Sequence, residues 1–314
     1  MLDAFVILND RFPLAVAIVA GVFGTIVGSF LNVCIARIPL GRSVIYPGSH
    51  CSCGKPIGWY DNLPVISWFA LRGKCRPCGQ PFSFRYPLVE GLTGVLFAFT
   101  WFSYPPMVAV IGMFFISLMI VATFVDWDYL IIPDRISIGG ALAGLALSFA
   151  VPALHGHPGT HVADNLLGGF DSLIGLLVGT AIIYWIGLLG TIAFRKDAMG
   201  EGDMKLLACI GAFLGWQGAV FALFGGAVIG ILVFLPLHFF SRKRRLPLTA
   251  FWTDWDALYP AENDKEDDGH KRNNLVMPFG PMLALGAVVY FLWLHGPVDN
   301  YFAEFAKLAG PRFF

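Results

Sequence analysis

Residues 12–36 read FPLAVAIVAGVFGTIVGSFLNVCIA and contain no charged side chain. A helix that crosses a bilayer needs roughly 20 mostly apolar residues. This segment is therefore long enough to span a membrane. Asp3 and Asp10 precede it where a secretory signal would carry basic residues, so we interpret the segment as a retained helix and not as a cleaved signal.

Further charge-free runs of span length follow at 136–154, 172–194 and 275–295. Two longer runs, 91–125 and 206–240, each contain a predicted turn, at Tyr104-Pro105-Pro106 and Gly215-Trp216-Gln217-Gly218. Splitting both runs predicts an all-α, polytopic transmembrane bundle of about eight spans. The composition agrees, because only 13% of residues are charged and a soluble domain carries about 25%.

The basic residues are distributed unevenly between the loops of this eight-span topology. Alternate loops fall into two sets, and one set holds 18 of the 21 Lys and Arg residues, whereas the other holds only Arg11, Lys307 and Arg312. Loops rich in Lys and Arg face the cytoplasm. The rich set therefore predicts which side is cytoplasmic, and it includes the loop at 37–87 and the polar loop at 241–274.

The loop at 37–87 contains two cysteine pairs, CSCG at 51–54 and CRPCG at 75–79. Two such turns can present four thiolates to one metal ion, as in a zinc ribbon, and the glycines after Cys53 and Cys78 suit the tight backbone of these turns. We therefore expect a small zinc module with Cys51, Cys53, Cys75 and Cys78 as metal ligands.

The first pair has a one-residue gap where two residues are usual, and His50 could replace one of its cysteines. Free or redox-active thiols and disulfides remain alternatives, although disulfides rarely persist in a reducing cytoplasm. Cys34 and Cys209 lie within apolar runs, and we interpret them as core residues.

Two aspartates stand at the cytoplasmic ends of predicted spans. Asp126 ends the third span and Asp203 begins the sixth, so the two can meet despite their separation in sequence. Ionisable groups at membrane depth are candidates for function. Two adjacent carboxylates share a proton, so one can accept a proton from water while the other donates one to a peptide carbonyl. The pair predicts an aspartyl peptidase site.

The same residues have structural interpretations. Asp134 follows a proline and precedes an apolar run, which favours a helix N-cap, and Asp203 could cap the sixth span. Gly200 and Gly202 could form a turn, or could let backbone or substrate approach Asp203 closely. A carboxylate-lined ion or proton pathway, as in a transporter, remains an alternative.

Four other acidic residues receive structural interpretations. We expect Asp128 and Glu201 to be solvated at the membrane interface, and Asp171 and Asp197 to be loop residues beside a span.

The chain resembles the type IV prepilin peptidases, which are bifunctional leader peptidases and N-methyltransferases of bacterial pili and type II secretion. The resemblance covers nearly the whole chain, in motifs that occur in order: GSFLNV at 28–33, RIP at 37–39, NLPVIS at 62–67, LRGKC at 71–75, RYPLVE at 85–90, DWDYLIIPD at 126–134, GEGDMK at 200–205 and PFGP at 278–281. The GxGD element occurs in other intramembrane aspartyl proteases, and the preceding cysteine loop narrows the choice to this family.

The resemblance implies cleavage of a leader peptide from prepilin or pseudopilin precursors at the cytoplasmic face, and methylation of the new N-terminal residue from S-adenosylmethionine. It places the catalytic pair at Asp126 and Asp203 and the metal ligands at the four loop cysteines. The loop near Glu90 is expected to handle the methyl donor and the new amine. A zinc-bearing membrane scaffold of a secretion system is a further alternative.

These inferences divide the chain into five segments. We expect an N-terminal segment with the first span (1–36), a cytoplasmic cysteine module with the methyl-transfer region (37–87), a transmembrane peptidase core (88–240), a cytoplasmic loop (241–274) and a last span with its tail (275–314). The expected location is the bacterial inner membrane, with precursor proteins and lipids as partners and no nucleic acid.

Overall fold

The computed structural model describes residues 9, 11–51, 53–195, 199–243 and 278–309. Every regular element among these residues is a helix, and two isolated β-bridges occur in the cysteine loop. The all-α prediction is confirmed. Asp197 and residues 244–274 of the predicted polar loop lie outside the described residues, and 241–243 continue a helix instead of beginning that loop.

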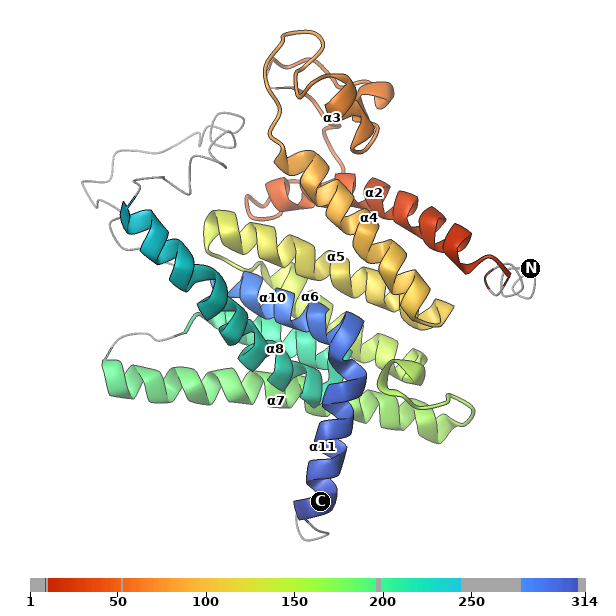
Figure 1. Cartoon of the computed structure of the whole chain (residues 1–314), viewed down its shortest axis with the longest axis vertical. Coiled ribbons are helices and arrows are strands. Elements are labelled where there is room, and N and C mark those ends of the chain that lie inside the picture. The colour runs from red at the N-terminus through yellow and green to blue at the C-terminus, as the bar shows by residue number, and fades with distance from the viewer. Residues whose placement is uncertain (1–8, 10, 52, 196–198, 244–277, 310–314) are drawn as a thin grey trace.

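The chain forms two helical groups that meet at α5 (Figure 1). The first group is α2 (Pro13–Arg37) packed on α4 (Arg85–Ser103), and the cysteine module between them contains η1 (Trp59–Asn62) and α3 (Ile66–Ala70). The second group contains α5 (Pro106–Tyr129), α6 (Asp134–Ala150), η2 (Pro152–His155), α7 (Val162–Phe194), α8 (Glu201–Lys243) and α10 (Gly280–Val289). A π-helical turn (Tyr290–Leu294) joins α10 to α11 (His295–Ala309).

Five helical segments are long and apolar enough to cross a membrane: Pro13–Arg37, Pro106–Tyr129, Val162–Phe194, Glu201–Leu232 and Gly280–Phe305. These segments identify a multi-pass membrane protein. The predicted break at residue 215 is present: Gly215 has non-helical φ +70° and ψ −178° and divides α8 into two helical parts, although Glu201–Leu232 counts as one of the five segments. The count of eight spans therefore stays a prediction.

The turn at Tyr104-Pro105-Pro106 lies where the sequence predicted it. α4 ends at Ser103, and α5 begins with Pro106, whose fixed φ and missing N–H suit the first turn of a helix. This turn reverses the chain, so the beginning of α4 and the end of α5 lie at the same end of the bundle. The cysteine module protrudes from that end (Figure 1).

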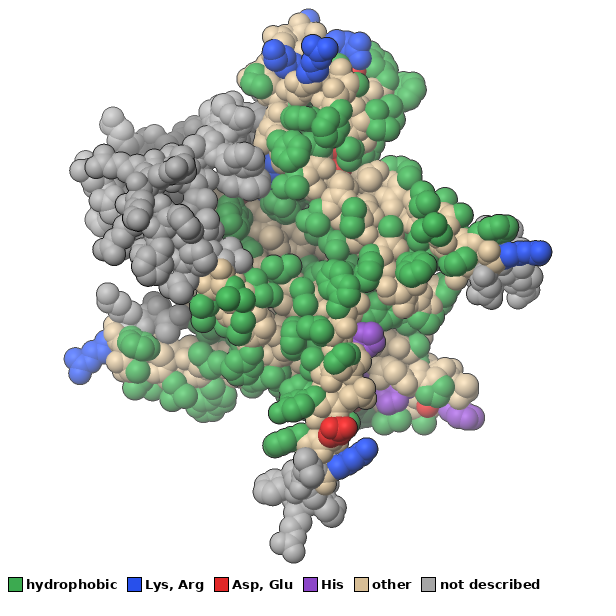
Figure 2. Space-filling view, in the orientation of Figure 1, with side chains coloured by type: hydrophobic (Ala, Val, Ile, Leu, Met, Phe, Trp, Pro, Cys, Tyr) green, Lys and Arg blue, Asp and Glu red, His purple; other side chains and the backbone are tan. Residues whose placement is uncertain are grey.

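Burial divides the helices into central and peripheral ones. α5 and α8 are mostly buried within the bundle, whereas α2 and α7 expose most of their apolar side chains, as a lipid-facing helix does (Figure 2). Small residues let α7 and α8 pack closely, since a Cβ at Gly179 would lie 2.6 Å from the carbonyl oxygen of Leu207. Cys34 and Cys209 are buried, which confirms their interpretation as core residues.

The prediction that Asp171 is a loop residue was wrong. Asp171 lies within α7 and not in a loop, and its carboxylate is 2.7 Å from Nε2 of His157. The reason is that α7 begins at Val162, about two and a half turns before the charge-free run on which the prediction was based.

Candidate active site

The structure brings the two predicted aspartates together. Asp126 lies in the last turn of α5, where its residue is 6% exposed, and Asp203 lies in the first turn of α8. Gly280, which bonds to Asp126, and Gly202, which precedes Asp203, both lie against Ile132, so the two acids stand at one junction although they are 77 residues apart in sequence (203 − 126). Two acids in this arrangement hold a proton between them more easily than two negative charges.

A backbone N–H orients Asp126. The amide nitrogen of Gly280, at the beginning of α10, donates to Oδ2 of Asp126 at 3.0 Å. A Cβ on Gly280 would lie 2.6 Å from that oxygen, so any side chain there would displace the carboxylate. Glycine is required at this position because the backbone itself approaches the acid.

Ile132 joins the three helix ends around the pair. The chain turns sharply after α5 because Leu130 adopts the left-handed conformation, with φ +55°, and its amide donates to the carbonyl oxygen of Asp126. Ile132 is consequently buried between Gly202 and Gly280. A Cβ added to Gly202 would lie 3.3 Å from the Cβ of Ile132, and a Cβ added to Gly280 would lie 3.0 Å from the Cδ1 of Ile132. Gly202 therefore lets α8 approach this turn.

The sequence reasoning assigned no role to Gly280 or Ile132. PFGP at 278–281 belonged to the resemblance, and its glycine before a proline at a helix start was the available signal. Gly200 lies beside the acid, and a Cβ there would make an ordinary contact of 3.7 Å with Oδ2 of Asp203, so its predicted role in close approach stays a prediction.

Asp134 and Glu201 lie at the edge of the pair. Asp134 is the first residue of α6 and makes no capping bond, so the N-cap prediction was wrong, and Pro133 holds the cap position. The carboxylate of Asp134 instead accepts a hydrogen bond of 2.8 Å from Nζ of Lys205, which joins α6 to α8. The side chain of Glu201 is exposed, as predicted for a solvated group.

Asp128 was predicted to be solvated, and that prediction was wrong. Its Oδ2 lies 2.6 Å from Nη1 of Arg85, and both side chains are largely buried. The guanidinium of Arg85 also lies over the ring of Phe124, 5.0 Å from its centroid. The pair forms because α4 begins beside the end of α5, which spacing along the chain does not reveal.

Glu90 is a third buried carboxylate at the same end of the bundle. It is 7% exposed, its Oε2 accepts a hydrogen bond of 2.7 Å from the amide of Val65, and the hydroxyl of Ser29 also bonds to it. The bond from Val65 connects the cysteine module to α4.

A cavity of about 450 Å³ opens beside Glu90, between the cysteine module and the ends of α2 and α4. Its lining includes polar and aromatic residues: Ser29, Asn32, Arg37, Trp68, Tyr86 and Glu90. The rim of the cavity is held by Arg37, which donates to the carbonyl oxygens of Ser43 and Pro47 at 3.1 and 2.7 Å. The cavity has the size and lining of a small-molecule site.

The four loop cysteines form one cluster. Their sulfur atoms all lie within 4.8 Å of one another, and the sulfurs of Cys51 and Cys78 are 3.5 Å apart. A tetrahedral zinc site with Zn–S bonds of about 2.3 Å places its sulfurs about 3.8 Å apart, so the residues fit a metal ion. His50 lies outside the cluster, and its Nδ1 is 3.0 Å from the carbonyl oxygen of Gly48.

The two cysteine turns repeat one backbone arrangement. The amide of Cys51 donates to Lys55 and that of Cys75 to Gln80, and the glycine of each turn, Gly54 or Gly79, donates back to the first cysteine with φ above +70°. The prediction that glycine suits these turns is confirmed.

A backbone hydrogen bond and burial shift the pKa values of two of these thiols in opposite directions. The amide of Gln80 lowers the pKa of Cys78 to about 7, whereas burial raises the pKa of Cys51 to about 12. A bound metal ion would favour the thiolate form at both.

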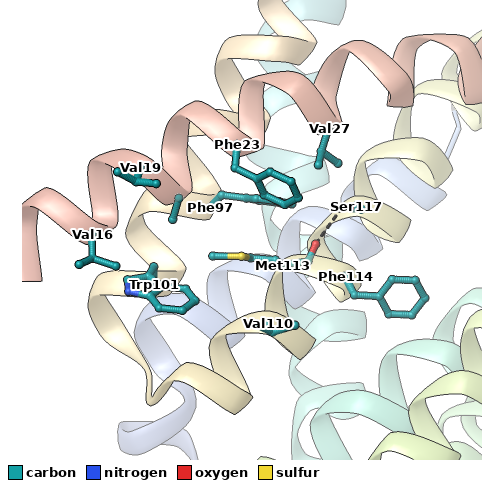
Figure 3. A pocket seen from close by; sticks show the side chains of 11 residues that line it. Val16, Val19, Phe23, Val27, Phe97, Trp101, Val110, Met113, Phe114 and Ser117 are labelled. Atoms are coloured by element: carbon teal, nitrogen blue, oxygen red, sulfur yellow. Dashed lines mark hydrogen bonds between the residues drawn. The ribbon is translucent and has the colours of Figure 1, made fainter. Parts of the chain in front are cut away.

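A second cavity, of about 420 Å³, lies among α2, α4 and α5 and is apolar (Figure 3). Phe23, Phe97 and Met113 project into it, and its one polar side chain, Ser117, donates to the carbonyl oxygen of Met113 at 2.8 Å. No ionisable side chain lines this cavity. It therefore offers space to an apolar group and no acid–base chemistry.

Two family models match the chain. The bacterial peptidase A24 N-terminal domain matches residues 22–104, and the type IV leader peptidase family matches residues 113–235. No solved structure matches.

Curated relatives cover most of the chain. A prepilin leader peptidase/N-methyltransferase of Myxococcus xanthus is 34% identical over 87% of this chain and 90% of the relative. One of Klebsiella pneumoniae is 35% identical over 62% and 83%, and a type 4 prepilin-like proteins leader peptide-processing enzyme of Escherichia coli is 32% identical over 89% and 94%. The chain therefore belongs to the prepilin leader peptidase/N-methyltransferase family.

Proposed function

We propose that this protein cleaves the leader peptide from prepilin-like precursors at the cytoplasmic face of the bacterial inner membrane, and then methylates the new N-terminal amine from S-adenosylmethionine. Family membership supports the two activities. The observation that supports the hydrolytic assignment is the position of Asp126 and Asp203 at the helix ends of α5 and α8, which meet with the beginning of α10 around Ile132.

The pair supplies both proton transfers of peptide hydrolysis. One carboxylate is ionised and removes a proton from water as the oxygen attacks the scissile carbonyl carbon, while the protonated carboxyl donates to the carbonyl oxygen. When the C–N bond breaks, the leaving amine takes up a proton from the pair. Because the two acids titrate together, neither role belongs to one residue alone. The N–H of Gly280 fixes the orientation of Asp126 throughout.

The substrate has to expose its peptide bond. Carbonyl groups within a helix are engaged in i→i−4 hydrogen bonds, so we propose that the precursor's N-terminal helix enters from the lipid and unwinds near the pair. The family name of several relatives, prepilin leader peptidase, supports such a precursor as substrate.

The proposed orientation places the cysteine module in the cytoplasm. Exposed basic side chains gather at the tip of the module (Figure 2), and Lys55, Arg72, Lys74 and Arg76 are exposed residues of the module. Such residues are retained on the cytoplasmic side. Eight crossings remain our proposal for the topology: α4, α6 and the two parts of α8 on either side of Gly215 would each contribute one. With this topology we also propose the five segments predicted from the sequence, with the same boundaries.

Zinc is the proposed metal of the cysteine cluster. Four thiolates in two glycine-containing turns suit a closed structural site, which would hold the two halves of the module together. No proton transfer of the hydrolysis involves this site, and its contribution is to the folding of the module.

Asparagine substitutions test the aspartate pair. Asp126→Asn and Asp203→Asn should each reduce leader cleavage by about 100- to 10,000-fold, the usual contribution of general acid–base catalysis. Asp171→Asn is the matched control, because Asp171 lies toward the beginning of α7 and is not part of the pair. This variant should cleave the leader at the normal rate. Cleavage is measured by mass spectrometry of a prepilin-like substrate in detergent or proteoliposomes.

A normal cleavage rate in either variant would refute the assignment. If both Asn variants instead complement a deletion strain fully, the protein acts as a scaffold. Substrate-dependent ion flux in proteoliposomes that both variants abolish would favour a transporter.

A further inference from the structure

Glu90 and the cavity beside it are not used by the hydrolytic site. We propose that this cavity binds the methyl donor through its aromatic walls and that Glu90 is the catalytic residue of methyl transfer, where its carboxylate binds the new terminal amine, and not the donor, and accepts the amine's proton. The inference rests on the proposed methyl transfer and assigns that reaction to residues.

The fold places the Glu90 carboxylate at the cavity wall. α2 and α4 approach closely here, since a Cβ on Gly28 would lie 2.7 Å from the Cα of Glu90. An ionised carboxylate has about four acceptor positions, and Val65 and Ser29 each donate one hydrogen bond. Acceptor capacity remains for the N–H groups of a ligand.

The bond from Val65 shows that the position of this carboxylate is closely constrained. Val65 has φ +60° and ψ −52°, and the amide of Ile66 donates to the carbonyl oxygen of Pro64 at 2.6 Å, which defines a γ-turn of the rare, strained form. A β-branched residue seldom has positive φ. Strain of this kind persists where the surrounding structure enforces it, and it concentrates at functional sites. The hydrogen bond to Glu90 is one of the contacts that enforce it.

The lining fits both reactants of a methyl transfer. Glu90 supplies a negative charge for the terminal ammonium, and Trp68 and Tyr86 supply faces for the aromatic base and the sulfonium cation of the donor. The indole of Trp68 is fixed by a hydrogen bond to the carbonyl oxygen of Phe82, and Asn32 is fixed by one to that of Tyr86. A volume of about 450 Å³ accommodates a molecule of the size of S-adenosylmethionine.

The cavity and the aspartate pair lie toward the same end of the bundle. Arg85 is five residues before Glu90 on α4, which corresponds to about 7.5 Å along a helix. It forms the ion pair with Asp128, two residues after Asp126 on α5. This ion pair connects the helix that carries Glu90 to the helix that carries Asp126.

The step balances without any further reactant. Glu90 takes a proton from the terminal ammonium, and the freed lone pair of nitrogen attacks the methyl carbon of the sulfonium donor. The N–C bond forms as the C–S bond breaks, and sulfur keeps that electron pair and becomes a neutral thioether. A second proton leaves the methylated nitrogen to water.

Glu90→Gln tests the assignment, because glutamine keeps an acceptor for Val65 and removes only the charge. Methylation of a peptide that already lacks its leader should fall at least about 100-fold, the lower range for loss of a general base. Leader cleavage should be retained, which shows that the variant is folded. Glu304→Gln, an exposed glutamate on α11, is the matched control.

Donor binding is measured separately, by calorimetry with S-adenosylmethionine and with its thioether product. Glu90→Gln should bind both like the parent protein, whereas Ser29→Phe, which adds bulk beside Glu90, should bind both at least tenfold more weakly. Full methylation by Glu90→Gln, or weaker binding of only the sulfonium form, overturns the role of Glu90. Unchanged donor binding by Ser29→Phe overturns the cavity assignment. These outcomes leave the peptidase function untouched, because that function fails only with the aspartate variants.

Discussion

The two carboxylate sites at the end of the bundle that carries the cysteine module differ in what surrounds each acid. Asp126 and Glu90 are both buried, and each accepts one backbone N–H, from Gly280 and from Val65 respectively. Asp126 lies at the junction of helix ends that also holds Asp203, whereas Glu90 lines a cavity with aromatic walls. A shared proton suits hydrolysis, and a lone negative charge suits the binding of a cation. The surroundings of each carboxylate, and not its residue type, therefore distinguish the two proposed reactions.

The largest effect is expected from losing the metal, and it should fall on the Glu90 site alone. Cys75→Ser, or chelation of the purified protein, should unfold the module that carries Val65 and Trp68, because structural zinc contributes about 10–16 kcal/mol to folding. Methylation should be lost while cleavage of the leader continues.

Metal analysis should find one zinc ion per chain in the parent protein and none in this variant. Cys34→Ser, at a buried cysteine outside the cluster, is the control that should keep its zinc. Loss of cleavage together with methylation would show that the two sites depend on one folding unit.

Arg85 connects α4, which carries Glu90, to the end of α5, which carries Asp126, so its loss should affect both sites. Arg85→Met leaves Asp128 buried without its cation, which costs about 3–5 kcal/mol for a buried ion pair. Thermal stability in detergent and both activities should fall together.

The double variant Arg85→Met/Asp128→Leu should recover most of that stability, because no uncompensated charge remains. If the double variant is as unstable as Arg85→Met, the ion pair is not the reason for the loss.

Gly280→Ala should affect only the aspartate pair. The added Cβ would lie 2.6 Å from Oδ2 of Asp126, and a shift of about 1 Å in a catalytic group can reduce the rate by about 100-fold. Cleavage should fall by about that factor, with methylation of a leaderless peptide unchanged. Gly139→Ala is the control, since a Cβ there meets no atom within 4 Å. Equal cleavage by both variants would contradict the close approach.

The smallest effect is expected at the edge of the pair. Lys205→Met removes the ion pair with Asp134, whose carboxylate is mostly exposed, and such pairs contribute about 1 kcal/mol or less. Cleavage should change by less than about fivefold, and the difference should shrink at high salt. A larger loss in an initial-rate assay would assign Lys205 to the catalytic machinery.

Sequence reasoning found residues whose chemical type is unusual in their surroundings. Asp126 and Asp203 stand out at the ends of apolar runs, and the four cysteines stand out in a polar loop, so each could be singled out without a structure. The environment of Asp128 could not be found in this way, because Arg85 reaches it only after α4 and α5 fold back on each other. The same holds for Asp171 and for the partner of Asp134.

The sequence by itself determined that this protein is a membrane bundle of helices with a cysteine module, because apolar length and residue type are local properties. Only the tertiary structure decided which groups meet: Gly280 at Asp126, Ile132 between the helix ends, and Val65 at Glu90. These contacts join segments 25 to 154 residues apart. Their geometry depends on how helices pack, and no local pattern in the chain encodes it.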